Sequence, residues 1–253
     1  MTKVDHIHLA SALIPAVLAA GAIEMRHYRS GVTVEAKADQ SPVTIADREA
    51  EAVLIAAITA AAPAIPIIAE EAVSAGQMPA IGAEFFLVDP LDGTREFIEQ
   101  RGEFTVNIAL VRDGAPVFGI VYAPATEELY VTLGPSAAAM ARMAPRETPI
   151  ALTDIDLAPI RTRCPDQSAL CALASRSHSN AETEAFLGRY RIAQRTNAGS
   201  SLKFCAIARG AADIYPRLGP TMEWDTAAGH AVLLAAGGAV TTLDGAPLRY
   251  GNT

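Results

Sequence analysis

The chain has 253 residues, of which 51% are hydrophobic and 19% are charged, and its formal net charge is −8. This composition supplies a large buried core, for one large domain or two small ones, and excludes an intrinsically disordered chain. The acidic balance argues against nucleic acid or an anionic membrane surface as the main partner, because either requires a basic face.

Hydrophobic periodicity and turn residues predict the elements of the first half in chain order. They are helices over residues 5–29 and 44–61, strands over 65–69 and 84–88, a short helix over 95–100, and a hairpin of strands 105–112 and 116–122. The hairpin turns at Asp113-Gly114, a dipeptide typical of two-residue turns. The uncharged stretch over residues 9–23 is shorter than the roughly 20 residues that span a bilayer, so we expect a buried first helix and no transmembrane segment.

The second half begins in a region of weak periodicity over residues 134–168, which is rich in Pro, Ala and Ser. Beyond it we expect a strand over 172–175, helices over 181–187 and 200–209, a helix after Trp224-Asp225, and a short strand after Gly237-Gly238. Alternating strands and helices indicate an α/β arrangement. The predicted organisation is an N-terminal α+β domain over residues 1–145, with most metal ligands, and a C-terminal α/β domain over residues 146–253 that completes the substrate site.

Cysteine content and missing motifs narrow the chemistry. Cys164, Cys171 and Cys205 are too few for a disulfide framework and have no zinc-ligand spacing, which favours a reducing, cytoplasmic location. Peripheral attachment to the cytoplasmic side of the inner membrane stays open, and the sequence does not fix the oligomeric state. The sequence lacks G-x-S-x-G, G-x-x-x-x-G-K-[ST] and H-E-x-x-H. Carboxylates therefore remain as the candidate catalytic groups.

The most informative carboxylates follow the apolar strand over residues 84–88. Asp89 stands at the carboxyl end of that strand, where α/β proteins usually place their sites. Pro90 forces a turn, after which Asp92 returns to the same side. Gly93 permits close approach of a ligand, and the free amides of Gly93 and Thr94, at the start of the next helix, form an anion site.

Further acidic residues surround this segment. Between Glu70 and Glu103 there are eight acidic and only two basic residues. Glu70 directly follows the strand over residues 65–69 and can supply a third carboxylate. Since Mg²⁺ prefers hard oxygen ligands and often shares its shell with substrate phosphate, the pattern predicts Mg²⁺-dependent phosphate chemistry.

Four blocks of the sequence resemble the inositol monophosphatase superfamily and occur in family order over residues 37–238. They are Ser41-Pro42-Val43-Thr44-Ile45-Ala46-Asp47, Glu70-Glu71, Asp89-Pro90-Leu91-Asp92-Gly93-Thr94, and Trp224-Asp225-Thr226-Ala227-Ala228-Gly229 with Gly237-Gly238. The resemblance implies mixed α/β and α+β structure in a layered α-β-α-β-α sandwich of the inositol monophosphatase and fructose-1,6-bisphosphatase type.

Three further segments are similar to the bacterial CysQ-type 3′(2′),5′-bisphosphate nucleotidases. They are Ser175-Arg176-Ser177-His178, Gly199-Ser200-Ser201-Leu202-Lys203-Phe204 and Tyr215-Pro216-Arg217-Leu218-Gly219-Pro220-Thr221. Arg217 stands where inositol phosphatases typically carry a glutamate, and a guanidinium suits a second phosphate because it binds phosphate in a bidentate manner. The resemblance implies a small bisphosphate nucleotide as partner: the enzyme would remove the 3′-phosphate of 3′-phosphoadenosine 5′-phosphate to give AMP, in connection with sulfate assimilation.

The resemblance also implies two or three Mg²⁺ ions, inhibition by Li⁺, and roles for individual residues. The metal ligands would be Glu70, Asp89, the Leu91 carbonyl, Asp92 and Asp225. Asp47 and Thr94 would form a pair that orients and activates the attacking water. The substrate contacts would come from Glu70, Leu91, Asp92, Gly93, Thr94, Ser177, His178, Ser200, Lys203, Arg217 and Asp225.

Three alternative functions stay open at this point. The first is an inositol-phosphate or fructose-bisphosphate phosphatase of the same superfamily. The second is an aspartyl-phosphate phosphatase, because Asp92-Gly93-Thr94 is similar to D-x-D-G-T, although the D-x-x-D spacing here is one residue too long. The third is a catalytically silent sensor of nucleotide or metal, against which the presence of every expected ligand argues.

Overall fold

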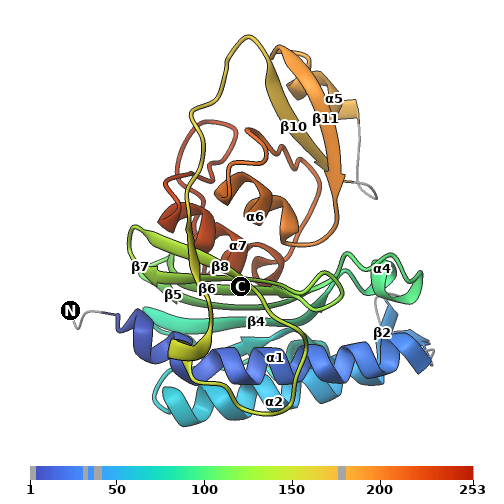
Figure 1. Cartoon of the computed structure of the whole chain (residues 1–253), viewed down its shortest axis with the longest axis vertical. Helices are drawn as coiled ribbons and strands as arrows, with labels where there is room; N and C mark the ends of the chain where they lie inside the picture. The colour runs from blue at the N-terminus through green and yellow to red at the C-terminus, as the bar shows by residue number, and fades with distance from the viewer. Residues whose placement is uncertain (1–3, 31–33, 37–41, 176–180, 253) are drawn as a thin grey trace.

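The computed structural model describes residues 4–30, 34–36, 42–175 and 181–252 (Figure 1). The helices are α1 (His6–Ser30), α2 (Ile45–Ala61), α3 (Glu70–Ser74), α4 (Thr94–Ile98), α5 (Ala181–Leu187), α6 (Leu202–Ala208) and α7 (Glu223–Ala235), with a 3₁₀ turn η1 (Leu152–Asp154). The strands are β1 (Val34–Ala36), β2 (Pro42–Thr44), β3 (Ile67–Ala69), β4 (Glu84–Asp92), β5 (Thr105–Arg112), β6 (Ala115–Ala123), β7 (Glu128–Gly134), β8 (Ala137–Arg142), β9 (Ala158–Ile160), β10 (Leu170–Ser175) and β11 (Ile192–Ala198).

A seven-stranded sheet with the order β3-β4-β5-β6-β7-β8-β9 forms the centre of the fold. β3 and β4 are parallel, and the other neighbouring strands are antiparallel. The predicted hairpin of β5 and β6 turns at Asp113 and Gly114, which have φ angles of 51° and 73°. Both angles lie in the left-handed region that this kind of tight turn requires.

The layers follow the expected order. α1 and α2 cover one face of the seven-stranded sheet, and α7 covers the other face with α6 beside it (Figure 1). The parallel pair β10–β11 lies beyond α6, with α5 next to it (Figure 1). The succession of helix, sheet, helix, sheet and helix confirms the α-β-α-β-α sandwich.

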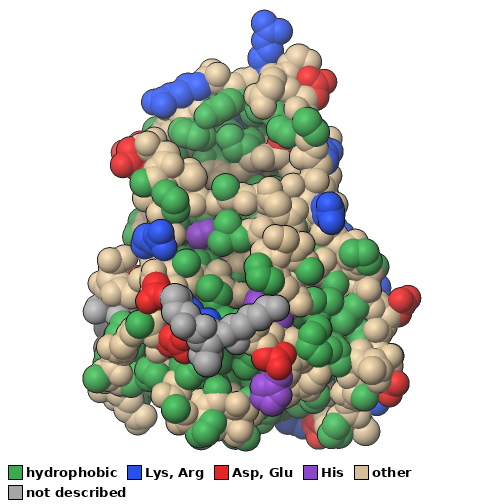
Figure 2. Space-filling view, turned by 90° about the vertical axis from the view of Figure 1, so that its left-hand side faces the viewer, with side chains coloured by type: hydrophobic (Ala, Val, Ile, Leu, Met, Phe, Trp, Pro, Cys, Tyr) green, Lys and Arg blue, Asp and Glu red, His purple; other side chains and the backbone are tan. Residues whose placement is uncertain are grey.

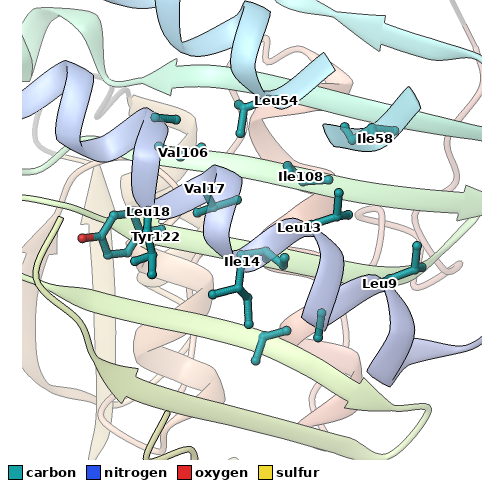
Figure 3. Packing of buried hydrophobic residues seen from close by; sticks show 14 of the residues in the cluster. Leu9, Leu13, Ile14, Val17, Leu18, Leu54, Ile58, Val106, Ile108 and Tyr122 are labelled. Carbon is teal, nitrogen blue, oxygen red and sulfur yellow. The ribbon is translucent and has the colours of Figure 1, made fainter. Parts of the chain in front are cut away.

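The larger core lies between α1, α2 and the sheet (Figure 3). Its fully buried side chains include Leu13, Ile14, Leu18, Leu54, Ile58, Val106, Ile108 and Tyr122. By length and composition α1 could cross a membrane, but 61% of its apolar 18-residue stretch is buried inside the fold. Packing against the sheet therefore accounts for the hydrophobicity of α1.

The second core lies between α7 and the opposite face of the sheet, and it sets the position of the site. Phe85 and Leu87 of β4 belong to this core. A Cβ on Gly119 would collide with the carbonyl oxygen of Ala228, so glycine at this position lets α7 lie directly on β6. Since alternate residues of a strand share a face, Asp89 points toward the same side of the sheet as Phe85 and Leu87, where α7 begins.

The element assignment differs from the structure mainly in the second half. β7 and β11 were not predicted, and β8 and β9 lie in the region assigned no regular structure. β8 is composed of Ala, Met and Arg, which favour strands weakly, so pairing with β7 decides its conformation. The expected strand after Gly237-Gly238 is only an isolated bridge between Thr241 and Pro247 in the part of the chain that the structure describes. The division into domains between residues 145 and 146 stays a proposal. β9, after this boundary, pairs with β8, before it, so the central sheet contains strands from both parts.

Candidate active site

The site begins at the end of β4. Asp89 is buried, and the pairing of β4 with β5 becomes irregular between Asp89 and Asp92. In this irregular segment the backbone N–H of Leu91 donates to Asp89 Oδ1 at 3.0 Å. Gly93 follows with a φ of 94°, and a Cβ there would lie 3.0 Å from the carbonyl oxygen of Glu103. The left-handed backbone and the close approach explain why glycine ends this turn.

Asp225 reaches the same place from α7. Its Oδ2 accepts hydrogen bonds from Thr221 Oγ1 at 2.8 Å and from the Met222 backbone N–H at 3.1 Å. Carboxylate oxygens of Asp89, Asp92 and Asp225 all lie within 4.8 Å of one another. The fold therefore brings Asp225 to two carboxylates that precede it by more than 130 residues in the chain.

Charge repulsion and burial act together on these groups. Burial raises the pKa of Asp89 well above its usual range, and the neighbouring Glu70, Asp92 and Asp225 raise it further. Burial and, after it, the charge of Asp225 raise the pKa of Asp92 to about 7. Without a cation, the site therefore favours protons on carboxyl groups that would otherwise be ionised.

Glu70 comes from the neighbouring strand. β3 runs parallel to β4 and pairs Ala69 with Val88, so Glu70 and Asp89 follow at the same edge of the sheet. The effect of Glu70 on the pKa of Asp89, through its charge and a shared hydrogen bond, shows that the two carboxyl groups are close. The carboxylates that follow β3 and β4 thus lie at the same end of the sheet, and the role of Glu70 as a metal ligand stays a prediction.

The donor set fits a hard divalent cation. Mg²⁺ takes oxygen ligands, and a cation among these carboxylates would remove the repulsion that holds protons on Asp89. The Leu91 carbonyl accepts a hydrogen bond from Thr94 Oγ1 at 3.3 Å, which leaves one lone pair for a further contact. The residues present can therefore hold the metal that the resemblance implies.

The expected pair of Asp47 and Thr94 is not formed in this structure. Asp47 is buried near the start of α2, and its Oδ2 accepts from the Thr44 backbone N–H at 2.7 Å and from Thr44 Oγ1 at 2.6 Å. Thr94 Oγ1 donates to the Leu91 carbonyl instead. Asp47 bonds with Thr44 and not with Thr94 because Thr44 is the N-cap of α2 and forms a capping box with Asp47. Burial raises the pKa of Asp47 to about 6, although the hydrogen bonds from Thr44 lower it.

Ser200 and Lys203 approach from the start of α6. Ser200 has a φ of 52°, and its Oγ bonds with Thr105 Oγ1 and accepts from the Ser201 backbone N–H at 2.6 Å. Lys203 is buried, and its Nζ lies 5.4 Å from the centre of the Tyr215 ring. Burial lowers the pKa of Lys203, whereas Asp92 raises it. The ammonium group therefore lies close enough to Asp92 to interact with it.

Arg217 brings a second positive charge to the site. Its guanidinium lowers the pKa of Asp92, as Lys203 does. Its Nη2 donates to the Pro220 carbonyl at 2.9 Å, whereas its Nε is buried and forms no well-aligned hydrogen bond with the described residues. A buried N–H without an acceptor is costly, so this donor suits an anion.

Some site residues are not placed, and others were not predicted. Ser177 and His178 lie outside the described residues. Thr221, which binds Asp225, and Thr105, which binds Ser200, were not identified as site residues from the sequence. The contact of Thr105 with Ser200 joins segments 95 residues apart, for which a single threonine carries no sequence signal. The contact of Thr221 with Asp225 is local, four residues apart at the start of α7, and the sequence analysis missed it.

Comparison with known proteins identifies relatives over most of the chain. The family model described as "Inositol monophosphatase family" matches residues 5–253. The 3′(2′),5′-bisphosphate nucleotidase CysQ of Shigella flexneri is 43% identical over 217 residues, which are 86% of this chain and 82% of that protein.

Solved structures give the same relationship. A crystal structure of CysQ from Bacteroides thetaiotaomicron, a bacterial member of the inositol monophosphatase family, matches with a TM-score of 0.77 and 37% identity over 95% of this chain and 91% of that chain. An inositol monophosphatase from Anabaena matches with a TM-score of 0.72 and 27% identity over 95% of this chain and 86% of that chain.

Proposed function

Because this chain belongs to the inositol monophosphatase family, we propose that it is a metal-dependent 3′(2′),5′-bisphosphate nucleotidase. It removes the 3′-phosphate of 3′-phosphoadenosine 5′-phosphate and releases AMP, in connection with sulfate assimilation. The observation that carries the choice of substrate is the pair of cations, Lys203 and Arg217, that act on Asp92 at the edge of the carboxylate cluster. We place this activity in the cytoplasm, with attachment to the inner membrane as the alternative.

The carboxylates supply the metal site. Two or three Mg²⁺ ions would be held by Glu70, Asp89, the Leu91 carbonyl, Asp92 and Asp225. When bound, the ions supply positive charge that acidifies water and stabilises the charge that develops on the phosphate oxygens.

The neighbouring residues bind the nucleotide and orient the water. The amides of Gly93 and Thr94 hold the phosphate that is cleaved, and Arg217 holds the other phosphate through its free Nε donor. Asp47 and Thr94 orient the attacking water, which requires Thr94 to exchange its hydrogen bond with Leu91 for one with Asp47.

The reaction is a direct displacement by water. The water oxygen bonds to phosphorus while the bond from phosphorus to the 3′ oxygen breaks. The water proton passes toward the pair of Asp47 and Thr94, and the 3′ oxygen takes a proton from solvent. No covalent intermediate with the protein forms.

The test is release of phosphate from 3′-phosphoadenosine 5′-phosphate and from inositol 1-phosphate, side by side, with and without Mg²⁺. We expect Mg²⁺-dependent release with a higher kcat/KM for the nucleotide. In Arg217→Gln this preference falls by about 10–100-fold, because a charged hydrogen bond to phosphate is lost. A preference for the sugar phosphate would assign the chain to the phosphatases of the family that act on sugar phosphates. An unchanged preference for the nucleotide in Arg217→Gln would remove the proposed role of Arg217.

A further inference from the structure

Glu51 is a buried carboxylate that the reaction described above does not use. It lies on α2, one turn after Asp47, and both side chains are buried. Residues four positions apart share a face of a helix, so α2 presents both carboxylates toward the same side. The partners of Glu51 are backbone groups of another element.

Glu51 binds the start of α3 with both of its oxygens. Its Oε2 accepts from the backbone N–H of Glu71 at 2.8 Å, and its Oε1 accepts from the backbone N–H of Ala72 at 2.9 Å. These amides belong to the first turn of α3, where backbone N–H groups have no acceptor within the helix. The N-cap residue of α3 is Ala69, whose side chain makes no capping hydrogen bond.

The start of α3 fixes the position of Glu70. α3 has only five residues, too few for a helix to be stable by itself. Its first residue is Glu70, which directly follows the last residue of β3 that pairs with β4. Pairing of β3 therefore holds the chain before Glu70, and Glu51 holds the chain directly after it.

We propose that Glu51 is a positioning residue of the metal site: its carboxylate anchors the first turn of α3 and thereby keeps the carboxylate of Glu70 beside Asp89. The inference rests on the proposed role of Glu70 as a metal ligand. Groups that support a metal ligand typically change metal affinity by about 10–100-fold when they are removed. In Glu51→Gln one carboxylate oxygen becomes an NH₂ group that faces a backbone N–H, so one of the two hydrogen bonds is lost.

The test compares Glu51→Gln and Glu51→Ala with the wild type. Hydrogen exchange in the metal-free protein measures the protection of the Glu71 and Ala72 amides, and calorimetric titration with Mg²⁺ measures metal affinity. We expect Glu51→Ala to lose protection at these two amides and to bind Mg²⁺ about 10-fold more weakly, with Glu51→Gln between it and the wild type. Glu49→Gln is the matched control on the same helix, because Glu49 is exposed in part and pairs with Arg26 and His27.

Two outcomes would overturn the inference. One is loss of protection at the two amides with Mg²⁺ affinity unchanged, and the other is unchanged protection. If Glu51→Ala fails to unfold cooperatively, Glu51→Gln decides by the same criteria.

Glu70→Gln separates the inference from the proposed function. Unchanged Mg²⁺ affinity in Glu70→Gln would remove the assignment of Glu70 as a metal ligand, and the inference about Glu51 with it. If Mg²⁺ binds more weakly to Glu70→Gln but not to the Glu51 variants, the inference about Glu51 is overturned and the role of Glu70 as a metal ligand stands.

Discussion

Asp89 is a carboxyl group that the fold places where a negative charge is unstable. Burial and the carboxylates of Glu70, Asp92 and Asp225 all favour its protonated form. A protein tolerates such repulsion at a site where a cation compensates it, which is why strongly raised carboxyl pKa values are common at functional sites. The repulsion among these carboxylates and their affinity for a metal therefore have the same origin.

Asp89→Asn should separate these two effects. We expect kcat/KM to fall by at least roughly 100-fold, since a lost ligand costs no less than a lost supporting group. The Tm of the metal-free protein should rise, because a neutral amide removes the repulsion with Asp92 and Asp225. Steady-state kinetics and thermal melts in EDTA measure both, with Asp113→Asn in the exposed β5–β6 turn as the control. Retained Mg²⁺-dependent turnover in Asp89→Asn would remove the site assignment.

Glu24 on α1 is fully buried, and neither of its carboxyl oxygens has a hydrogen-bond partner in the part of the chain that the structure describes. Burial raises its pKa well above the usual value, and the charge of Asp47 adds to this effect. A folded-state pKa above the unfolded value means that stability falls as pH rises from the unfolded pKa, roughly 4.3, toward the folded one. Glu24→Met should therefore increase the free energy of unfolding by about 1–3 kcal/mol near pH 8 and by less at pH 5. Urea unfolding at both pH values measures this, and an equal gain at both would contradict it.

Sequence reasoning at the residue scale succeeds where spacing within one segment decides the outcome. Asp89 and Asp92 are three residues apart, and a proline and a glycine make the turn between and after them predictable. The pair of Asp47 and Thr94 depends on two distant segments, and in this structure Asp47 bonds with its neighbour Thr44 instead. A local capping contact competes with a long-range contact, and the sequence alone does not show which of the two Asp47 forms.

At the scale of elements, the N-terminus of α2 partly offsets the effect of burial on the charge of Asp47. Thr44 caps α2 and donates two hydrogen bonds to Asp47, both of which favour the ionised carboxylate. Secondary-structure capping and the chemistry of the site thus share the same atoms.

Thr44→Ala should shift the pH dependence of activity. Loss of the hydroxyl donor raises the pKa of Asp47 above its present value of about 6, so a larger fraction is protonated at a given acidic pH. Because the proposed role of Asp47 needs the carboxylate, the acidic limb of kcat/KM against pH should move to higher pH. The lost cap should also destabilise the fold by about 1 kcal/mol. Thr44→Ser keeps the hydroxyl and is the control; an unshifted acidic limb in Thr44→Ala would argue against ionised Asp47 in the reaction.

Elements with a strong local pattern were predicted, and elements defined by their neighbours were not. α1, α2 and the hairpin of β5 and β6 carry clear periodicity or turn signals, and their predicted ranges agree with the structure to within a few residues. β11 contains Gln194, Arg195 and Asn197, and much of it is exposed. It is a strand because it pairs in parallel with β10, a contact that no local pattern encodes.

At the scale of the molecule, the site exists because β3, β4 and α7 meet at one edge of the central sheet. Packing of α7 over Gly119 brings Asp225 to Asp89 and Asp92, although the chain between them forms seven further strands. On the face shown in Figure 2, the Lys and Arg side chains of the described residues are scattered and form no continuous basic stripe. The positive charges that matter for the proposed substrate are the two beside the carboxylates.

Metal binding should stabilise the whole fold. At 100 times its Kd, Mg²⁺ adds about 2.7 kcal/mol, which corresponds to a Tm increase of roughly 5–10 °C in a chain of this size. The increase should be larger at pH 8 than at pH 5, because protons compete for Asp89 and for Asp92, whose pKa is about 7. Thermal melts with Mg²⁺ and after EDTA measure it, and an equal increase at both pH values would show that Mg²⁺ binds elsewhere.

The most direct test of the proposed activity is ³¹P NMR of 3′-phosphoadenosine 5′-phosphate mixed with the protein and Mg²⁺. We expect the 3′-phosphate resonance to disappear, inorganic phosphate to appear in equal amount, and the 5′-phosphate resonance to remain as that of AMP. Loss of the 5′-phosphate with the 3′-phosphate retained, or no change in either resonance, would contradict the proposed reaction.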